Sequence, residues 1–342
     1  MSPVERRILA DVPVSDWDRL AGDGFLASRG FLDLWRTMGG RPVTWVVEDA
    51  GHAAAMLPGV EYGFGPWRRF AALPDGCYGG VRVDPALACE ERRFARALLD
   101  AIVRHGYAKA CVFDFHRRLT PGRGYEEHVE ATRWIDIGDP EWRPADPKLR
   151  SQIRKAMREG IVIEPFDWDR HAAGFMALVT ANARRRGQRP RHPAAFYRAL
   201  AHLAAGDRRI RWYHCERDGR PVASHIYFAT DNTLQAWQSY FDRAFSFLKP
   251  NPYIREAACR EAVRAGVRWL NLGATPVGAT GLAYYKSRWG GSELRYSSWY
   301  RWHGFGSVAR IRYGSVPKPP VPRSRSARLG VPLWTSPTRP NE

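Results

Sequence analysis

Apolar positions along the chain follow helix and strand periods in an order that occurs twice. Residues 97–106 and 257–266 each carry an apolar stripe at helical spacing and end at a glycine. Each is followed by a short apolar run, at residues 109–115 and 267–272, of the kind that forms a buried strand. A glycine directly after a helix is a common stop because it adopts a left-handed backbone at no steric cost. The pattern predicts two helix–strand units.

Further pairs precede each of these units. Residues 46–56 and 214–224 each read as two strands around a tight turn, the second containing Asp218-Gly219, a strong hairpin signal. Before them, residues 31–35 and 196–200 have helical patterns. The order helix, hairpin, helix, strand therefore recurs at an offset of roughly 160–170 residues. We interpret this as two copies of one α/β domain.

Proline and glycine content indicates where the two copies join. We expect an N-terminal half over residues 1–137, a linker over 138–148 and a C-terminal half over 149–302. Asp146 followed by Pro147 predicts the capped start of a helix. Residues 316–342 are rich in Pro, Arg and Ser, and we expect a mobile basic tail there.

Charge adds an expectation about partners. The net charge is +18 and the pI about 10.1, so the surface should attract nucleotide phosphates, RNA, acidic lipids or anionic glycan precursors. The alternative is a compositional preference for arginine with no anionic partner. Both alternatives are open on sequence alone.

Cysteines and apolar runs bear on the compartment. The chain has five scattered cysteines without a Cys-x-x-Cys pair, which argues against a disulfide framework or a structural zinc site. We read no signal peptide and no run near the ~20 apolar residues that span a bilayer. We therefore expect a cytoplasmic protein, with peripheral contact at the inner membrane surface as an extension of that expectation.

One lysine stands out because the chain uses six Lys among 53 Lys and Arg residues. Lys286 belongs to the sequence Tyr-Tyr-Lys-Ser-Arg-Trp-Gly-Gly at residues 284–291, just after the strand at 267–272. A compact ammonium in a chain that nearly always uses guanidinium groups suggests a specific role.

Three segments together resemble a known family. They are the closing motif at 284–291, the Arg-rich helix at 149–160 with the strand at 161–165, and the Gly-Arg-Pro-Val-Ala strand at 219–223. They are similar to the FemAB-like branch of the GNAT acyltransferase superfamily, which includes proteins described as BioF2-like acetyltransferases. The resemblance covers about residues 25–300 and is most specific after residue 149.

The resemblance implies a fold and an activity. The fold would be two tandem GNAT-type α/β domains, each a mixed sheet with flanking helices. The activity would be transfer of an acyl or aminoacyl group from acyl-CoA or aminoacyl-tRNA to an amine, with no bound cofactor or metal. The acceptor would be a small amine, an amino sugar or a nucleotide- or lipid-linked cell-envelope precursor, and tRNA would be a partner where it carries the donor.

Acyl transfer to an amine requires stabilisation of an oxyanion and a proton for the leaving group. Lys286 is our candidate for the oxyanion or for a donor phosphate, and the resemblance assigns this lysine to the reacting centre. Tyr284 and Tyr285 are candidate proton donors. The alternatives are an exposed lysine at a helix start, and tyrosines that only pack against the sheet.

Candidate phosphate ligands are basic residues near predicted helix ends. Arg150 and Arg154 are four residues apart on one helix face, beside Lys155, and could hold a diphosphate or a tRNA backbone. The alternative is a solvated basic face. Lys249 lies in residues 245–252, which contain no glycine, so it would replace some of the grip that a Gly-rich turn gives a pyrophosphate.

The sequence offers more than one candidate for the general base. Asn271 lies in the strand at 267–272 where relatives place an acid, and an amide cannot take a proton at neutral pH. Glu256 or His225 would then be the base, or the amine would arrive neutral; a buried His225 could equally be a hydrogen-bonded core residue. Two Gly-rich loops, at 63–67 and 76–80, are expected near the cleft between the halves.

A different class of function is also consistent with the charge. The chain could be a non-catalytic RNA-binding or membrane-surface protein on a GNAT-like scaffold. In the second case the basic tail would hold it to anionic lipid.

Overall fold

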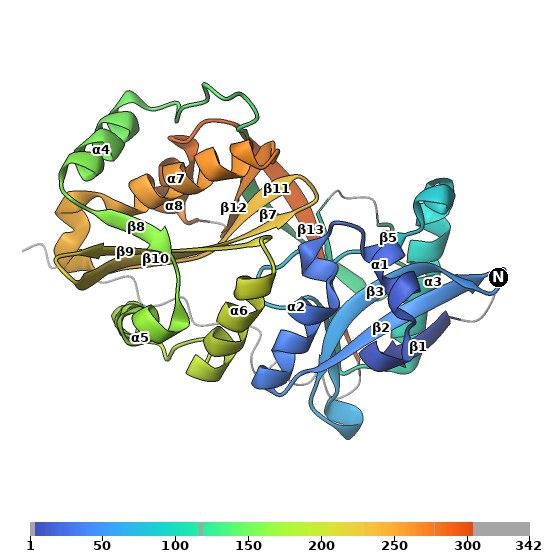
Figure 1. The fold of residues 1–342 in the computed structure, drawn as a ribbon. Helices are drawn as coiled ribbons and strands as arrows, with labels where there is room; N and C mark the ends of the chain where they lie inside the picture. Colours follow the sequence, from blue (N-terminus) through green and yellow to red (C-terminus); the bar gives the residue numbers. More distant parts are fainter. Residues whose placement is uncertain (1–3, 116–118, 277, 304–342) are drawn as a thin grey trace, which may run out of the picture.

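The computed structural model describes residues 4–115, 119–276 and 278–303 (Figure 1). The expected basic tail at 316–342 lies outside these residues. All the described strands belong to one mixed sheet. They are β1 Val4–Ile8, β2 Arg41–Asp49, β3 His52–Tyr62, β4 Arg69–Ala72, β5 Arg82–Val83, β6 Lys109–Asp114, β7 Tyr125–Asp136, β8 Val162–Pro165, β9 Ile210–Arg217, β10 Arg220–Thr230, β11 Thr233–Phe241, β12 Trp269–Thr275 and β13 Ser292–Trp302.

Helices cover both faces of this sheet. They are α1 Val14–Ala21, α2 Arg29–Leu34, α3 Glu91–His105, α4 Pro147–Arg158, α5 Trp168–Arg185, α6 Ala194–Gly206, α7 Pro250–Arg264 and α8 Thr280–Ser287. Around β9–β11, α7 and α4 lie on one side, and α5 and α6 on the other (Figure 1). Among the described residues, no helix has the length and apolar character needed to span a membrane.

The repeated order predicted from the sequence is confirmed. It is α2, hairpin β2–β3, α3 and β6 in the first half, and α6, hairpin β9–β10, α7 and β12 in the second. Both hairpins turn through two residues of positive φ, as a type I′ turn requires. These are Ala50 and Gly51 at 49° and 82°, and Asp218 and Gly219 at 52° and 70°.

Helix ends also follow the sequence signals. The Asp146 carboxylate accepts from the backbone N–H groups of Lys148 and Leu149 at 2.6 and 3.3 Å, which caps α4 with Pro147 in its first turn. Gly106 ends α3 in the left-handed conformation at φ 76°. Residues 138–146 of the expected linker contain no helix or strand, and its last two residues begin α4.

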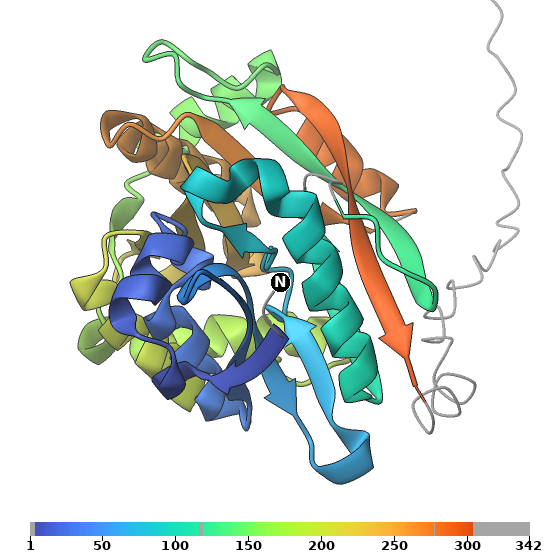
Figure 2. The same cartoon turned by 90° about the vertical axis from the view of Figure 1, so that its right-hand side faces the viewer.

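Two long strands are exchanged between the halves. β7 follows β6 in the chain but pairs with β12, where Ile135 lies opposite Leu270. β13 follows β12 but pairs with β6, where Tyr300 lies opposite Cys111. β7 and β13 also pair with each other, side by side in Figures 1 and 2. The sheet therefore continues without interruption through the join, and the division into domains at residues 137–149 stays a prediction.

An apolar core is shared by the two halves. Phe25 and Phe31, from the first half, lie 5.0 and 5.3 Å from the ring of Phe228 on β10. Trp35 lies 5.2 Å from Phe196 on α6. All these side chains are buried, and burying aromatic rings of this size supplies much of the stabilisation of a domain core. The same packing fixes how the two halves face each other.

Candidate active site

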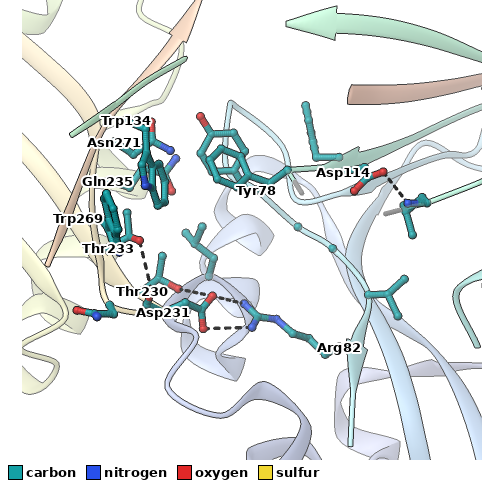
Figure 3. Close-up of a pocket in the computed structure, with 18 of the residues that line it drawn as sticks. Tyr78, Arg82, Asp114, Trp134, Thr230, Asp231, Thr233, Gln235, Trp269 and Asn271 are labelled. Atoms are coloured by element: carbon teal, nitrogen blue, oxygen red, sulfur yellow. Dashed lines mark hydrogen bonds and ion pairs between the residues drawn. The ribbon is translucent and has the colours of Figure 1, made fainter. Parts of the chain in front are cut away.

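A cavity of about 560 Å³ lies between the two halves (Figure 3). The first half contributes Tyr78 to Arg82 and the end of β6 with Asp114, and the second half contributes Gln235, Trp269 and Asn271. The Arg82 guanidinium and the Asp231 carboxylate, 2.9 Å apart, join the halves at one end of the cavity. A cavity of this size suits a small organic molecule or part of a larger one.

Aromatic rings form much of the wall. Phe115 lies 4.5 Å from Tyr78 and 5.2 Å from Trp134, measured between ring centroids. Trp134 is stacked on Trp269 at 5.7 Å. Rings from β7, β12 and the segments after β4 and β6 thus form an apolar part of the cavity wall.

Two buried amides place polar atoms in this wall. Gln235 donates from Nε2 to the Gly76 carbonyl at 3.0 Å, and its buried Oε1 has no hydrogen-bond partner among the described residues. Asn271 accepts at Oδ1 from Thr132 Oγ1 at 2.6 Å and from the Gly273 N–H at 2.8 Å. These bonds fix both amides, because they use the Gln235 donor and the Asn271 acceptor. Gln235 therefore offers an acceptor to a ligand, and Asn271 offers a donor.

Tyr78 adds a hydroxyl to the same region. Its buried OH forms no hydrogen bond of full geometry among the described residues, although Asn271, Thr132 and Tyr296 lie close enough to lower its pKa. Burial raises the pKa of Tyr78 to about 12, against a smaller opposite effect of Asn271 and Thr132. The phenol is therefore protonated at neutral pH and can donate a hydrogen bond, but it cannot serve as a base there.

The loop that carries Tyr78 has a strained backbone. Leu73 and Asp75 have positive φ of 65° and 62°, and Gly76 has 74°. A left-handed backbone costs a non-glycine residue free energy and persists only where its surroundings hold it. At Gly79 a Cβ would lie 2.3 Å from the Ala72 carbonyl oxygen, so only glycine fits. Residues 73–80 are hereafter called the strap.

Contacts from the second half hold the strap in place. The Asp75 carboxylate accepts from His192 Nε2 at 2.6 Å and pairs with Arg191. The Asp75 carbonyl accepts from Trp237 Nε1 at 3.1 Å. His192 is fully buried, with Nδ1 3.2 Å from Gln238 Nε2. Burial first, and the Arg191 charge second, lower the pKa of His192 to about 4, so the ring is neutral and donates to Asp75.

A parallel strand pair separates at the wall of the cavity. β11 and β12 are paired from Thr233 and Trp269 to Gln235 and Asn271, and not beyond. Further on, β12 has a register shift against β7 between Asn271 and Ala274, where Gly273 adopts φ 74°. Beyond Gln235, β11 has no described ladder partner on the β12 side, and an extended, amide-containing ligand could pair with it there.

Lys286 holds this irregular end of β12. Its Nζ donates to the carbonyls of Gly273 and Ala274 at 2.6 and 2.8 Å, and to Thr275 Oγ1 at 3.1 Å. It lies in the last turn of α8 and is buried. The expected alternative, an exposed lysine at a helix start, is therefore wrong. Burial lowers the pKa of Lys286 to about 7, and the charge of Arg255 acts in the same direction.

Arg255 is a second buried cation beside this lysine. It is 7% exposed, donates to the Tyr285 hydroxyl at 3.1 Å and lies 5.4 Å from the Trp289 ring centroid. Its Nε has no hydrogen-bond partner among the described residues. Neither Arg255 nor Lys286 forms an ion pair with a described carboxylate, and uncompensated buried cations are costly unless they meet an anion.

Neither Lys286 nor the other residues proposed for catalysis line the cavity. Tyr284 is 68% exposed, so it neither packs against the sheet nor reaches the cavity. Glu256 is buried and paired with Arg260 on the same helix. His225 is fully buried, with Nδ1 2.9 Å from the Tyr227 hydroxyl and Nε2 2.9 Å from Asn251 Oδ1. Burial lowers its pKa to about 3. This is the arrangement of a hydrogen-bonded core histidine.

The proposed phosphate ligands lie on other parts of the second half. Arg150 donates to the carbonyls of Pro144 and Ala145 at 2.8 and 2.9 Å, which secures the chain before α4. Arg154 and Lys155 are exposed on α4. Lys249 occupies the left-handed position before α7, at φ 58°. None of the four lines the cavity, and their roles stay predictions.

Comparison with known proteins identifies the fold and the enzyme class. Residues 147–287 match the family model described as an acetyltransferase (GNAT) domain. The second half is a GNAT acyltransferase domain. No curated protein matches the chain significantly.

Solved structures share the fold of the whole chain, as the resemblance implied. The structure of FemX superposes with a TM-score of 0.65 at 11% identity, over 91% of this chain and 100% of that one. The C-terminal domain of a putative lysylphosphatidylglycerol synthetase from Agrobacterium fabrum gives 0.56 at 12% identity, over 87% and 95%. A tandem GNAT protein from the clavulanic acid biosynthesis pathway gives 0.52 at 16%, over 88% and 99%.

Sequence reasoning missed most of the cavity. It placed the loop at 76–80 near the cleft, and Gly79 and Gly80 do line the cavity, whereas residues 63–67 do not. For Asn271, the sequence indicated only that an amide stands where relatives place an acid. No local sequence motif marks the Gln235 amide, which lies opposite Asn271 in the strand pairing, or the Tyr78 hydroxyl. Their roles arise from packing between residues more than 150 positions apart.

Proposed function

We propose that the chain is an N-acyltransferase that moves an acyl or aminoacyl group from an activated donor to an amine held in the cavity. The observation that carries this proposal is the separation of β11 from β12 at Gln235 and Asn271, which are also wall residues. A donor arm lying between the two strands would bring its acyl carbon to an acceptor in the cavity.

The reaction assigns tasks to the wall residues. The amine nitrogen attacks the acyl carbon, a C–N bond forms, the C–S or C–O bond of the donor breaks, and the amine proton leaves while the leaving group gains one. Gln235 Oε1 would accept a hydrogen bond from the attacking N–H, which orients the lone pair. Asn271 and Tyr78 would donate to oxygen atoms of the ligands, among them the developing oxyanion.

Lys286 and Arg255 are proposed for the donor side. Two buried cations without a carboxylate partner would favour an anion near α8, either a donor phosphate or the oxyanion itself. Direct contact would require Lys286 to give up one of its present acceptors, so its first role is to hold the bulge at Gly273. Arg154, Lys155 and Lys249 would contact more distant phosphates, and Tyr285 would protonate the leaving group.

The proposal also covers the acyl donor, the acceptor and the place of the reaction in the cell. GNAT domains use acyl-CoA as co-substrate. Among the structural neighbours, the tandem GNAT protein of the clavulanic acid pathway is described in its form without AcCoA, and another is a putative lysylphosphatidylglycerol synthetase. Acyl-CoA and aminoacyl-tRNA are therefore both proposed donors. The acceptor is proposed to be an amino sugar, a small amine or a cell-envelope precursor, in the cytoplasm or at the inner membrane surface.

A donor screen tests this function. Full-length protein is heated with acetyl-CoA, longer acyl-CoAs or aminoacyl-tRNA, and the donors that raise the melting temperature are incubated with primary amines. Mass spectrometry should then detect an amide whose formation needs protein, donor and amine together. Donors that neither bind nor yield an amide above the protein-free rate would contradict the proposal.

A further inference from the structure

The turn between β3 and β4 projects beyond the rest of the molecule and carries two exposed aromatic side chains. Phe64 is 80% exposed and Trp67 is 51% exposed. The turn is the lowest part of the coloured ribbon in two views at right angles (Figures 1 and 2). Two exposed large aromatic residues three positions apart in one projecting turn differ from the isolated exposed apolar residues common on soluble proteins.

Hydrogen bonds to backbone carbonyls hold this turn in one conformation. Trp67 N donates to the Phe64 carbonyl at 3.1 Å, and Arg68 Nε donates to the Gly65 carbonyl at 3.2 Å. Gly63 has φ 79°, and a Cβ there would lie 2.9 Å from the Trp67 carbonyl oxygen. The two partly or largely exposed aromatic residues are therefore held by a defined backbone, so little ordering of the turn is needed when it binds.

Cationic residues follow the turn in the chain and lie on the elements next to it. Arg69 pairs in register with Lys109 at the start of β6, and the Arg68 carbonyl accepts from Ala108 N just after α3 and its Arg104. Arg68, Arg69 and Arg104 form no ion pair with a described residue. Glu61 is the one acidic residue described on the turn and on the adjoining ends of β2, β3, β4 and β6. Its carboxylate is already paired with Arg6 and Arg41.

We propose that residues 63–69 dock the protein onto an anionic lipid bilayer. Phe64 and Trp67 would enter the interface between headgroups and acyl chains, while Arg68 and Arg69 contact lipid phosphates. Residues 63–67 offer no carboxylate, amide or hydroxyl side chain for reading base edges, which favours a bilayer over a nucleic acid. None of residues 63–69 lines the cavity.

Vesicle sedimentation of the full-length protein tests the proposal. Vesicles of phosphatidylglycerol and phosphatidylcholine in equal amounts should bind it, and vesicles of phosphatidylcholine alone should bind it much more weakly. The double variant Phe64→Ser/Trp67→Ser should lower the partition coefficient by about tenfold. Phe247→Ser is the matched control, because Phe247 is also an exposed aromatic, at 53%, but lies in the second half. It should bind as wild type does.

Two results would overturn the proposal. All variants are first compared by melting temperature, which should be unchanged because the altered side chains are exposed. Wild-type binding by the double variant would assign binding to charge elsewhere and overturn the proposal. Loss of tRNA binding in the double variant, with vesicle binding unchanged, would show that the turn serves a nucleic acid, and would also overturn it.

Discussion

Lys286 shows how one side chain can link the motif seen in the sequence to the geometry of the site. The sequence predicted a special lysine from the scarcity of lysine and from the closing motif, and the structure places it in a buried position on the bulge of β12. Its three hydrogen-bond acceptors could not be predicted from sequence, because Gly273, Ala274 and Thr275 come within reach only through the turn between β12 and α8.

The pKa of Lys286 gives a prediction about stability. The pKa is about 7 in the folded protein and ordinarily about 10.5, so between these values the unfolded chain holds a proton that the folded chain releases. The free energy of unfolding therefore rises with pH across this window. Relative to Lys286→Met, the wild type should gain up to about 1.4 kcal/mol per pH unit at the steepest point.

Urea unfolding of both proteins at about pH 6, 7.5 and 9 measures this difference, because other titrating groups are common to both. A difference that stays constant over the range would show that Lys286 keeps an ordinary pKa in the folded state.

At the scale of elements, the strap depends on contacts that its own sequence does not reveal. The loop at 76–80 could be placed near the cleft from its glycines. Its attachment through Asp75 could not, because Arg191 and His192 are more than 110 positions away, in the irregular segment before α6. Regular elements were easier to predict, since caps such as Asp146 and turns such as Asp218-Gly219 are local signals.

Removing the Asp75 carboxylate should release the strap. Asp75→Ala leaves the buried His192 ring N–H without its acceptor, which should cost about 1–3 kcal/mol of unfolding free energy. Because the strap carries Tyr78 and packs on Gln235, KM for the acceptor should rise more than kcat falls. Denaturant unfolding and steady-state kinetics provide the two measurements.

Asp33→Ala is the matched control for this variant. It also removes a carboxylate paired with an arginine, Arg36, but both side chains are more than half exposed. It should change stability by less than about 0.5 kcal/mol and leave KM unchanged. Equal effects of the two substitutions, or an Asp75→Ala variant with wild-type KM, would contradict the role given to the strap.

At the scale of the molecule, the exchange of β7 and β13 joins what the sequence presents as two copies. The repeat itself could be predicted, because helix stops, hairpin turns and apolar runs recur in order. The exchange could not, since a strand's hydrophobic pattern does not specify which neighbour it pairs with. The shared core around Phe228 has the same origin in long-range packing.

This arrangement predicts cooperative unfolding. Neither half can lose its sheet without exposing the last strand of the other, so thermal unfolding should proceed in one transition with equal calorimetric and van't Hoff enthalpies. Differential scanning calorimetry measures both quantities. Two resolved transitions would show that the halves are stable separately.

The central claim is that the acceptor amine is acylated in the cavity between the halves, and Gly80→Phe tests it most directly. Gly80 lines the cavity, and a Cβ there would meet its nearest atom, the Phe113 carbonyl oxygen, at 3.9 Å, so a phenyl group can enter the open space. Gly206→Phe, at an open position at the end of α6, is the control. With the donor found in the screen, the account predicts that Gly80→Phe still binds donor but loses at least about a hundredfold in kcat/KM for the amine, while Gly206→Phe acts as wild type. Amine acylation by Gly80→Phe at the wild-type rate would contradict it.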